Sequence, residues 1–282
     1  MASDFELERS PEARALAEEA LLRLLVALEG PDIDLIVLGG LVPEILTRGQ
    51  DEAFPSHLGT VDVDIHIAFG VDPERDLSSL EDALETIGAE VDPKEEGWRW
   101  RIRIGAVRVK IDFLCDREDV AADQPIALPG CRVLTAANLR GTGFVARDWV
   151  EEELSGTIDG EQVTVMVKYA GLEGYLLAKS FAVRHRGLNR DNYDFVFVLI
   201  YNRAGGPANA ANLLRSGKFA DDVRNARSTF LEIEARFTDA NGFGPRSYAE
   251  QALLVDPESD SATLRADAVG AVLEFINALK LD

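Results

Sequence analysis

The stretch that decides the fold is Gly59-Thr60-Val61-Asp62-Val63-Asp64-Ile65, in which polar and apolar side chains alternate. Alternation of this kind is typical of a half-buried β-strand, whose successive side chains point to opposite faces. Asp62 and Asp64 then share one face, and the apolar side chains between them point into a core. Two carboxylates this close repel each other, and a bound cation relieves the repulsion. Oxygen ligands of this kind suit Mg²⁺, which in turn suits phosphates.

A third acid and a candidate phosphate-binding turn occur on either side of this strand. Downstream, residues 108–114 alternate again, with Asp112 on the polar face. Upstream, residues 34–38 form an apolar strand that runs into Gly39 and Gly40, and a short helix is expected over residues 43–48. Glycines at a strand-to-helix turn let the backbone approach a phosphate, and the helix N-terminus favours its negative charge.

A basic hairpin is predicted just before the third acid. Gly105-Ala106 lies between two alternating stretches, and a glycine at the first position of a two-residue turn suits the type II′ geometry. The register then pairs Arg103 with Arg108, Arg101 with Lys110 and Arg99 with Asp112, and it places Trp98 and Trp100 on the apolar face, in the core. Like charges directly opposite are destabilising. They become favourable if phosphates or the acids of the neighbouring strand lie over that face; the alternative is a solvated face.

The net charge is the most informative feature of the composition. The 282 residues carry a formal net charge of −21, which argues against general binding of nucleic acid, since affinity for a polyanion comes largely from basic contacts. Residues 1–93 hold 5 Lys/Arg against 22 Asp/Glu, a net of −17. Residues 94–117 and 164–190, by contrast, carry nets of +3 and +4. Positive charge is therefore concentrated around Asp112 and before residue 191, where a triphosphate would bind.

The order of strand, Gly-Gly turn, helix, Asp-x-Asp strand and later single Asp resembles the nucleotidyltransferase fold of the polymerase-beta-like superfamily. Residues 179–195 are similar to the last motif of the AbiEii/AbiGii-type nucleotidyltransferases, the toxins of type IV toxin-antitoxin systems. The resemblance covers roughly residues 34–200. Two positions depart from the family pattern: Leu41 stands where Ser or Thr is frequent, and Arg190 stands where Lys is usual.

The resemblance implies a Mg²⁺- or Mn²⁺-dependent enzyme that uses an NTP. Asp62 and Asp64 would hold the metals that bridge the triphosphate, and Asp112 would complete the second metal site and help to activate an acceptor hydroxyl. The remaining implied residues would contact or position the nucleotide: Gly39, Gly40, Thr60, Lys179, Arg186, Arg190, Asp191 and Asp194.

Spacing gives part of the last motif a meaning without the resemblance. Asp191 and Asp194 are three residues apart and share a helix face, one turn from a helix start at which Asn189 is expected to cap. Capping and compensation of the helix dipole is the alternative explanation for the two acids. His66 shares the polar face of Asp62 and Asp64, where it is expected to act as an indirect partner and not as a zinc ligand.

The predicted fold class is α+β: a nucleotidyltransferase-type mixed β-sheet flanked by helices over residues 1–169, followed by a helical domain over residues 170–282. Helices are expected over residues 11–28 and 77–87, and a second hairpin is expected at Asp159-Gly160. No apolar run is long enough to span a membrane, and the N-terminus lacks the pattern of a signal peptide. Together with only two cysteines, this predicts a cytoplasmic protein without a membrane partner.

Three functions remain open. The first is a toxin-like enzyme that modifies tRNA or another macromolecule and is held in check by a cognate antitoxin. The second is nucleotidylation of a small cationic molecule such as an aminoglycoside, which the acidity of residues 1–93 suits. The third is a non-catalytic relative that binds a nucleotide or a partner, which the missing hydroxyl at Leu41 leaves open.

Overall fold

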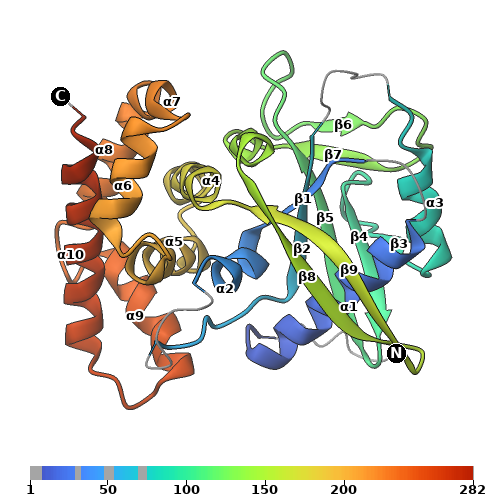
Figure 1. The fold of residues 1–282 in the computed structure, drawn as a ribbon, viewed down its shortest axis with the longest axis horizontal. Helices are drawn as coiled ribbons and strands as arrows, with labels where there is room; N and C mark the ends of the chain where they lie inside the picture. Colours follow the sequence, from blue (N-terminus) through green and yellow to red (C-terminus); the bar gives the residue numbers. More distant parts are fainter. Residues whose placement is uncertain (1–7, 29–32, 48–53, 69–74, 282) are drawn as a thin grey trace. The chain divides into compact units, whose positions relative to one another are not determined.

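The structure, a computed structural model, describes residues 8–28, 33–47, 54–68 and 75–281. The chain forms two compact units, Met1–Val42 with Gly59–Ala170 and Pro43–Leu58 with Gly171–Asp282 (Figure 1). The sequence predicts a single division after residue 169, whereas the structure assigns residues 43–58 to the second unit. The reason lies in long-range contacts of this segment, such as the hydrogen bond from Arg203 N to the Leu46 carbonyl oxygen at 3.2 Å.

The first unit is built on a mixed β-sheet, so the predicted fold class is confirmed. Within the described residues, nine strands form this sheet, and its main path runs β3-β4-β5-β2-β1-β9-β8, with β6 and β7 attached at β5. Strand β2 runs parallel to β5 and antiparallel to β1. The strands are β1 (Leu35–Leu38), β2 (Asp62–Ile67), β3 (Glu90–Val91), β4 (Arg99–Ile104), β5 (Val107–Cys115), β6 (Pro125–Ala127), β7 (Thr135–Asn138), β8 (Trp149–Ile158) and β9 (Glu161–Ala170).

Helix α1 (Pro11–Ala27) lies against the sheet, where it contacts β2, β4, β5 and β8 (Figure 1). The Ser10 hydroxyl accepts a hydrogen bond from Ala13 N at 3.1 Å, and Pro11 opens the first turn, so the predicted helix start is confirmed. Val63 and Phe113 on the central strands are fully buried, because α1 covers the apolar face of these strands. Helix α3 (Ser78–Thr86) packs beside α1 and matches the helix expected near residues 77–87.

Both predicted hairpins are confirmed. Strands β4 and β5 are joined by Gly105-Ala106, and Gly105 has the positive φ of +59° that the first position of a type II′ turn requires. Strands β8 and β9 are joined by Asp159 and Gly160, whose φ values of +52° and +92° fit a type I′ turn. The expected core position holds for Trp100, which is buried, but Trp98 is only half-buried.

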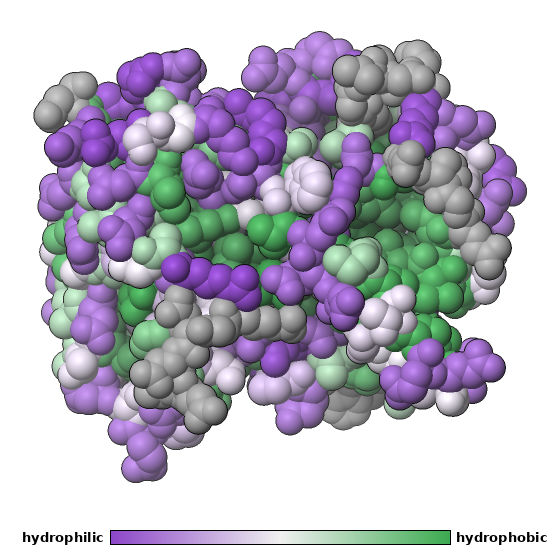
Figure 2. Space-filling model, in the orientation of Figure 1, coloured by the Kyte–Doolittle hydropathy of each residue, from purple (hydrophilic) through white to green (hydrophobic). Residues whose placement is uncertain are grey.

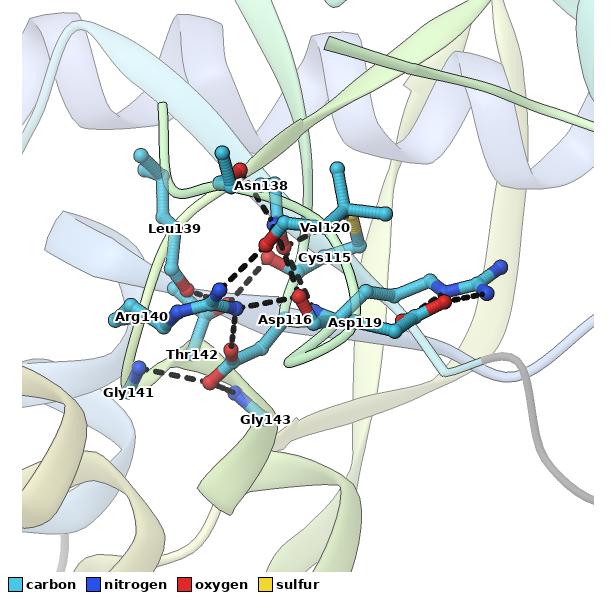
Figure 3. A network of polar contacts seen from close by, with 12 residues as sticks. Cys115, Asp116, Asp119, Val120, Asn138, Leu139, Arg140, Gly141, Thr142 and Gly143 are labelled. Carbon is cyan, nitrogen blue, oxygen red and sulfur yellow. Dashed lines mark hydrogen bonds and ion pairs between the residues drawn. The ribbon is translucent and has the colours of Figure 1, made fainter. Parts of the chain in front are cut away.

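A network of polar contacts fixes the chain beyond β5 (Figure 3). The Asn138 side-chain amide donates to the carbonyl oxygens of Arg117 and Val120 at 3.0 and 3.1 Å, and its oxygen accepts from Arg117 N at 2.7 Å. The Asp116 carboxylate accepts from Gly141 N at 2.8 Å. Main-chain partners therefore use much of the hydrogen-bonding capacity of both side chains, and we interpret the network as support for this loop.

The second unit is helical, in keeping with the end of strand patterns near residue 170. Helix α5 (Asn189–Tyr201) contacts α4, α6, α9 and α10, and its residues 191–199 are all buried. The rings of Phe195 and Phe230 both pack edge-on against Phe275, with centroids 5.9 and 6.1 Å away. The other helices are α2 (Val42–Thr47), α4 (Leu172–His185), α6 (Pro207–Ser216), α7 (Ala220–Asn225), α8 (Arg227–Arg236), α9 (Phe243–Val255) and α10 (Ser261–Leu279).

The surface reflects the high content of charged residues, which is 28%. Hydrophilic residues make up much of the face seen in Figure 2, with hydrophobic side chains showing between them. None of the helices in the described ranges combines the length and the apolar character that crossing a membrane requires.

Candidate active site

Three carboxylates lie side by side on the polar face of the sheet in the first unit. Asp62 and Asp64 belong to β2, and Asp112 belongs to the neighbouring parallel strand β5. Asp64 pairs directly with Asp112, and Asp62 pairs with Lys110. Adjacent strands are only about 4.8 Å apart, so the charges of these acids act on one another; Asp64 itself is half-buried. Asp62 and Asp112 are 7% and 4% exposed.

The glycine turn at the end of β1 packs directly against this acidic strand. Gly39 begins a short 3-10 helix, Gly39–Leu41, and has a φ of +74°. A Cβ atom at Gly39 would overlap Oδ2 of Asp64, and one at Gly40 would overlap the Thr60 side chain. Glycine is therefore required here by backbone conformation and by space. The helix expected over residues 43–48 begins one residue earlier, as α2, and its Arg48 lies outside the described residues.

Thr60 precedes β2 and orients the first of the acids. Its hydroxyl donates a hydrogen bond to Oδ1 of Asp62 at 3.0 Å, and it is 4% exposed. The resemblance implies that Thr60 contacts the nucleotide. In the structure its hydroxyl binds the Asp62 carboxylate. A buried hydroxyl that holds a carboxylate oxygen in one direction limits the rotamers that Asp62 can adopt.

Arg99 binds Asp112 across the β4–β5 hairpin, as the predicted register requires. Its Nε and Nη2 donate to the two carboxylate oxygens at 2.6 and 2.5 Å, and its guanidinium also lies 4.5 Å from the centre of the Trp98 ring. Burial raises the pKa of Asp112, Arg99 opposes that rise, and the charge of Asp62 adds to it. The hydrogen bond with Asp112 in turn raises the pKa of Arg99.

The three carboxylates have the chemistry of a Mg²⁺ or Mn²⁺ site, because such cations take oxygen ligands. As the side chains are arranged, no group of three or more His, Cys, Asp or Glu residues in the described part of the chain could hold a metal ion. Arg99 binds both oxygens of Asp112. The three acids therefore fit the ion by their chemistry, and the side chains, Arg99 included, would have to rearrange before all three acids could bind it together.

His66 continues the polar face of β2 beyond the acids. It is 3% exposed, and its Nδ1 has no hydrogen-bond partner among the described residues. Burial lowers the pKa of His66 to about 4, against the opposing charge of Asp116, so the ring is neutral at physiological pH.

A buried cluster in the second unit contains most of the predicted last motif. Lys179 Nζ lies 2.9 Å from Oδ2 of Asp194 and 3.2 Å from Oδ1 of Asp191. Arg186 donates to the same oxygen of Asp191 at 3.0 Å. Asp191 and Asp194 share a helix face, as their spacing predicts, and both acids are used to hold basic side chains. The cluster and the three carboxylates on the sheet belong to different units.

His57 is a member of this cluster that the sequence does not reveal. Its Nε2 lies 3.0 Å from Oδ1 of Asp194, and both side chains are almost completely buried. Its ring packs against Tyr193 and Phe197, with centroids 5.1 and 5.0 Å away. A single histidine in a stretch expected to be a loop carries no signal, because its partner is far away in the sequence.

Three more residues of this stretch lie outside the cluster's described contacts, and the expected cap at Asn189 is not formed. Arg184 turns to Glu232 and Thr229, with hydrogen bonds of 3.0 Å to each. Arg190 lies in the first turn of α5 and is half-buried. Asn189 does not cap the helix, because the helix begins at Asn189 itself; its side-chain oxygen accepts a hydrogen bond from Ser247 at 3.1 Å.

Comparison with known proteins leaves the family open. No protein-family model matches the chain, and no curated protein sequence matches it. Among solved structures, the chain is similar to the GTP complex of CdnG, a CD-NTase of Bradyrhizobium diazoefficiens, with 14% sequence identity over 99% of this chain and 88% of that chain. The TM-score is 0.26, which is too low to support an argument. Function must therefore be inferred from the chain's own residues.

Proposed function

We propose that the chain is a nucleotidyltransferase that moves an NMP from an NTP to an acceptor hydroxyl, with pyrophosphate as the leaving group. The observation that carries this proposal is the register of β2 and β5, which places Asp64 beside Asp112, with Asp62 on the same face. The glycine turn that packs against Asp64 is the second support, because its lack of side chains lets backbone lie directly beside the acids. The Gly-Gly turn, the Asp-x-Asp strand, the later single Asp and the last motif resemble those of the AbiEii/AbiGii-type enzymes. We propose that the chain belongs with these enzymes.

The carboxylates have distinct roles in this proposal. Asp62 and Asp64 would hold a divalent cation, which, when bound, neutralises charge on the triphosphate and orients it for in-line attack. Gly39 and Gly40 would let the triphosphate approach the backbone. Asp112, in β5, would complete the metal site and help to activate the attacking hydroxyl.

The resemblance implies a role toward the nucleotide for residues of the last motif, all of which belong to the second unit. Lys179 is 7% exposed and neutralised by two acids, so we assign it a positioning role. The Arg186 side chain is 44% exposed and uses only one of its five N–H groups on Asp191, which leaves donors for a phosphate. Arg190, from the first turn of α5, would add a second cation.

Two classes of acceptor hydroxyl fit this reaction. The resemblance favours a toxin-like enzyme that modifies tRNA or another macromolecule, with a cognate antitoxin as partner. The net charge of −17 over residues 1–93 favours the alternative of a small cationic acceptor such as an aminoglycoside. Growth arrest on expression, abolished by Asp62→Asn, supports the first acceptor, whereas raised drug tolerance supports the second.

The reaction itself is tested by transfer of label. Purified protein is incubated with Mg²⁺ or Mn²⁺ and each of the four α-labelled NTPs, in the presence of cell RNA, protein or small-molecule extract. Label should enter one fraction with the wild type and with Glu151→Gln, an exposed acid on β8, but not with Asp64→Asn. Absence of transfer from every NTP, or equal transfer by Asp64→Asn, would contradict the proposal.

We further propose that the protein works in the cytoplasm. Cys115 is buried and Cys131 is half-buried, and both are free thiols. Free thiols are typical of a reducing compartment. Mass spectrometry of alkylated protein from cells should find both thiols reduced; a modified or cross-linked pair would contradict this placement.

A further inference from the structure

Arg99 occupies one of the three carboxylates that would bind a metal ion. Its Nε and Nη2 donate to both oxygens of Asp112, which is the bidentate geometry in which a guanidinium binds a carboxylate most strongly. Asp112 is 4% exposed, so these hydrogen bonds are largely shielded from water. The oxygens with which Asp112 would bind a cation are therefore occupied by a cation of the protein itself.

The surroundings of Arg99 offer it another place to bind. Its Nη1 lies 3.4 Å from Oε1 of Glu95, and its guanidinium carbon lies 4.5 Å from the centre of the Trp98 ring. Neither contact depends on Asp112. A guanidinium released from Asp112 would keep an ion pair and a cation–π contact. Release therefore costs the bidentate pair and leaves the other favourable contacts of Arg99 in place.

Charge gives a reason for the exchange. Three carboxylates share this part of the sheet face, and Arg99 brings one positive charge, bound to Asp112 and felt by Asp62. A divalent cation brings two charges and attracts all three acids at short range. Once such an ion is present, Arg99 is repelled by it. Arg99 and a divalent cation therefore compete for Asp112.

We propose that Arg99 is a displaceable counter-ion that holds Asp112 out of the metal site until a divalent cation binds. This inference rests on the proposed function, because it takes Asp62, Asp64 and Asp112 as the metal ligands. Arg99 is a positioning residue, since it acts through Asp112 and not on the substrate. Arg99 also lowers the mutual repulsion of the three acids in the absence of metal, together with Lys110, which pairs with Asp62 and whose charge acts on Asp112.

The test is a calorimetric titration of the full-length, metal-free protein with Mn²⁺, without nucleotide. Arg99→Gln should bind Mn²⁺ more tightly than the wild type, on the order of tenfold, the effect expected when one competing charge-assisted pair is removed. Arg103→Gln is the matched control. Arg103 lies on the same strand and face but is exposed and pairs with Arg108 near the hairpin turn, so its loss should leave the Mn²⁺ affinity unchanged.

A second variant keeps the inference testable if Arg99→Gln does not fold. Glu95→Gln removes the alternative partner of Arg99, so displacement becomes harder and Mn²⁺ should bind more weakly than in the wild type. Circular dichroism checks the fold of each variant. Equal or weaker Mn²⁺ binding by folded Arg99→Gln, or unchanged binding by Glu95→Gln, would overturn the displacement. Absence of Mn²⁺ binding in the wild type and every variant would overturn the proposed function as well.

Discussion

Asp64 and Asp112 are direct partners across the parallel strands β2 and β5. This pairing brings acids from two separate sequence motifs to adjacent positions on one face of the sheet. Like charges at partner positions destabilise a sheet unless a cation lies near them. Arg99 provides that cation in the structure, and a divalent ion provides it in the proposed enzyme.

Gly39→Ala should abolish nucleotide transfer, with a loss on the order of a hundredfold or more, because a misplaced reacting group costs that much. The new Cβ would displace the Asp64 carboxylate, and φ at this position is +74°. Gly88→Ala is the control for backbone strain alone, since Gly88 has a φ of +70° but no atom within reach of a Cβ. The control should lose about 1–2 kcal/mol of stability and keep its activity. Equal transfer by both variants would argue against the role of Gly39.

Thr60→Val should weaken Mn²⁺ binding, whereas Thr60→Ser should not. Valine keeps the shape of the side chain but removes the hydroxyl that donates to Asp62 at 3.0 Å. The buried acceptor left without this donor should also lower the free energy of unfolding by about 1–3 kcal/mol. Titration with Mn²⁺ and unfolding in urea measure the two effects. Identical behaviour of the two variants would show that the hydroxyl does not orient Asp62.

His57→Phe should destabilise the second unit by about 1–3 kcal/mol, the cost of a buried polar group without a partner. Phenylalanine preserves the packing against Tyr193 and Phe197 but leaves Oδ1 of Asp194 without the ring nitrogen at 3.0 Å. His185→Gln, at the exposed end of α4, is the control and should stay within about 0.5 kcal/mol of the wild type. Urea unfolding checks both. An unchanged free energy of unfolding for His57→Phe would mean that the contact with Asp194 does not stabilise the second unit.

Lys179→Met should cost about 3–5 kcal/mol, because it leaves two buried carboxylates without their shared cation. Adding Asp194→Asn to this variant should restore part of the loss, and the double-mutant cycle measures the coupling. Lys168→Met is the control: its partner Asp34 is 49% exposed, so the change should cost less than about 1 kcal/mol. A larger loss for Lys168 than for Lys179 would contradict the assignment of the buried cluster.

Local patterns in the sequence predict the strands around the three acids well. The period of two in β2, β4 and β5, together with the Gly105 turn, sets the register that pairs Arg99 with Asp112. The reason is that a strand with one apolar and one polar face can be buried in only one way. Alternation predicts that Asp112 lies on a polar strand face, but the pairing of Asp112 with Asp64 comes from the structure, because alternation does not set the register between strands that are distant in the sequence.

Features that depend on distant contacts could not be predicted. His57 pairs with Asp194, and residues 43–58 join the helical unit, through contacts that no local pattern records. The two-residue strand β3 is too short to show a period. The sequence also does not predict that Arg99 donates two hydrogen bonds to Asp112. The strand register shows only that the two residues face each other, and the side-chain geometry is a separate matter.

The central claim is that Asp62, Asp64 and Asp112 hold the divalent cation that accompanies an NTP. Its most direct test is equilibrium dialysis of a non-hydrolysable NTP analogue against the full-length protein, with and without Mn²⁺. The wild type should bind the analogue with Mn²⁺ present and lose most of that binding without it. The double variant Asp62→Asn, Asp64→Asn should bind on the order of a hundredfold more weakly with Mn²⁺. Equal binding by the wild type and this variant, or binding by the wild type that does not depend on Mn²⁺, would contradict the claim.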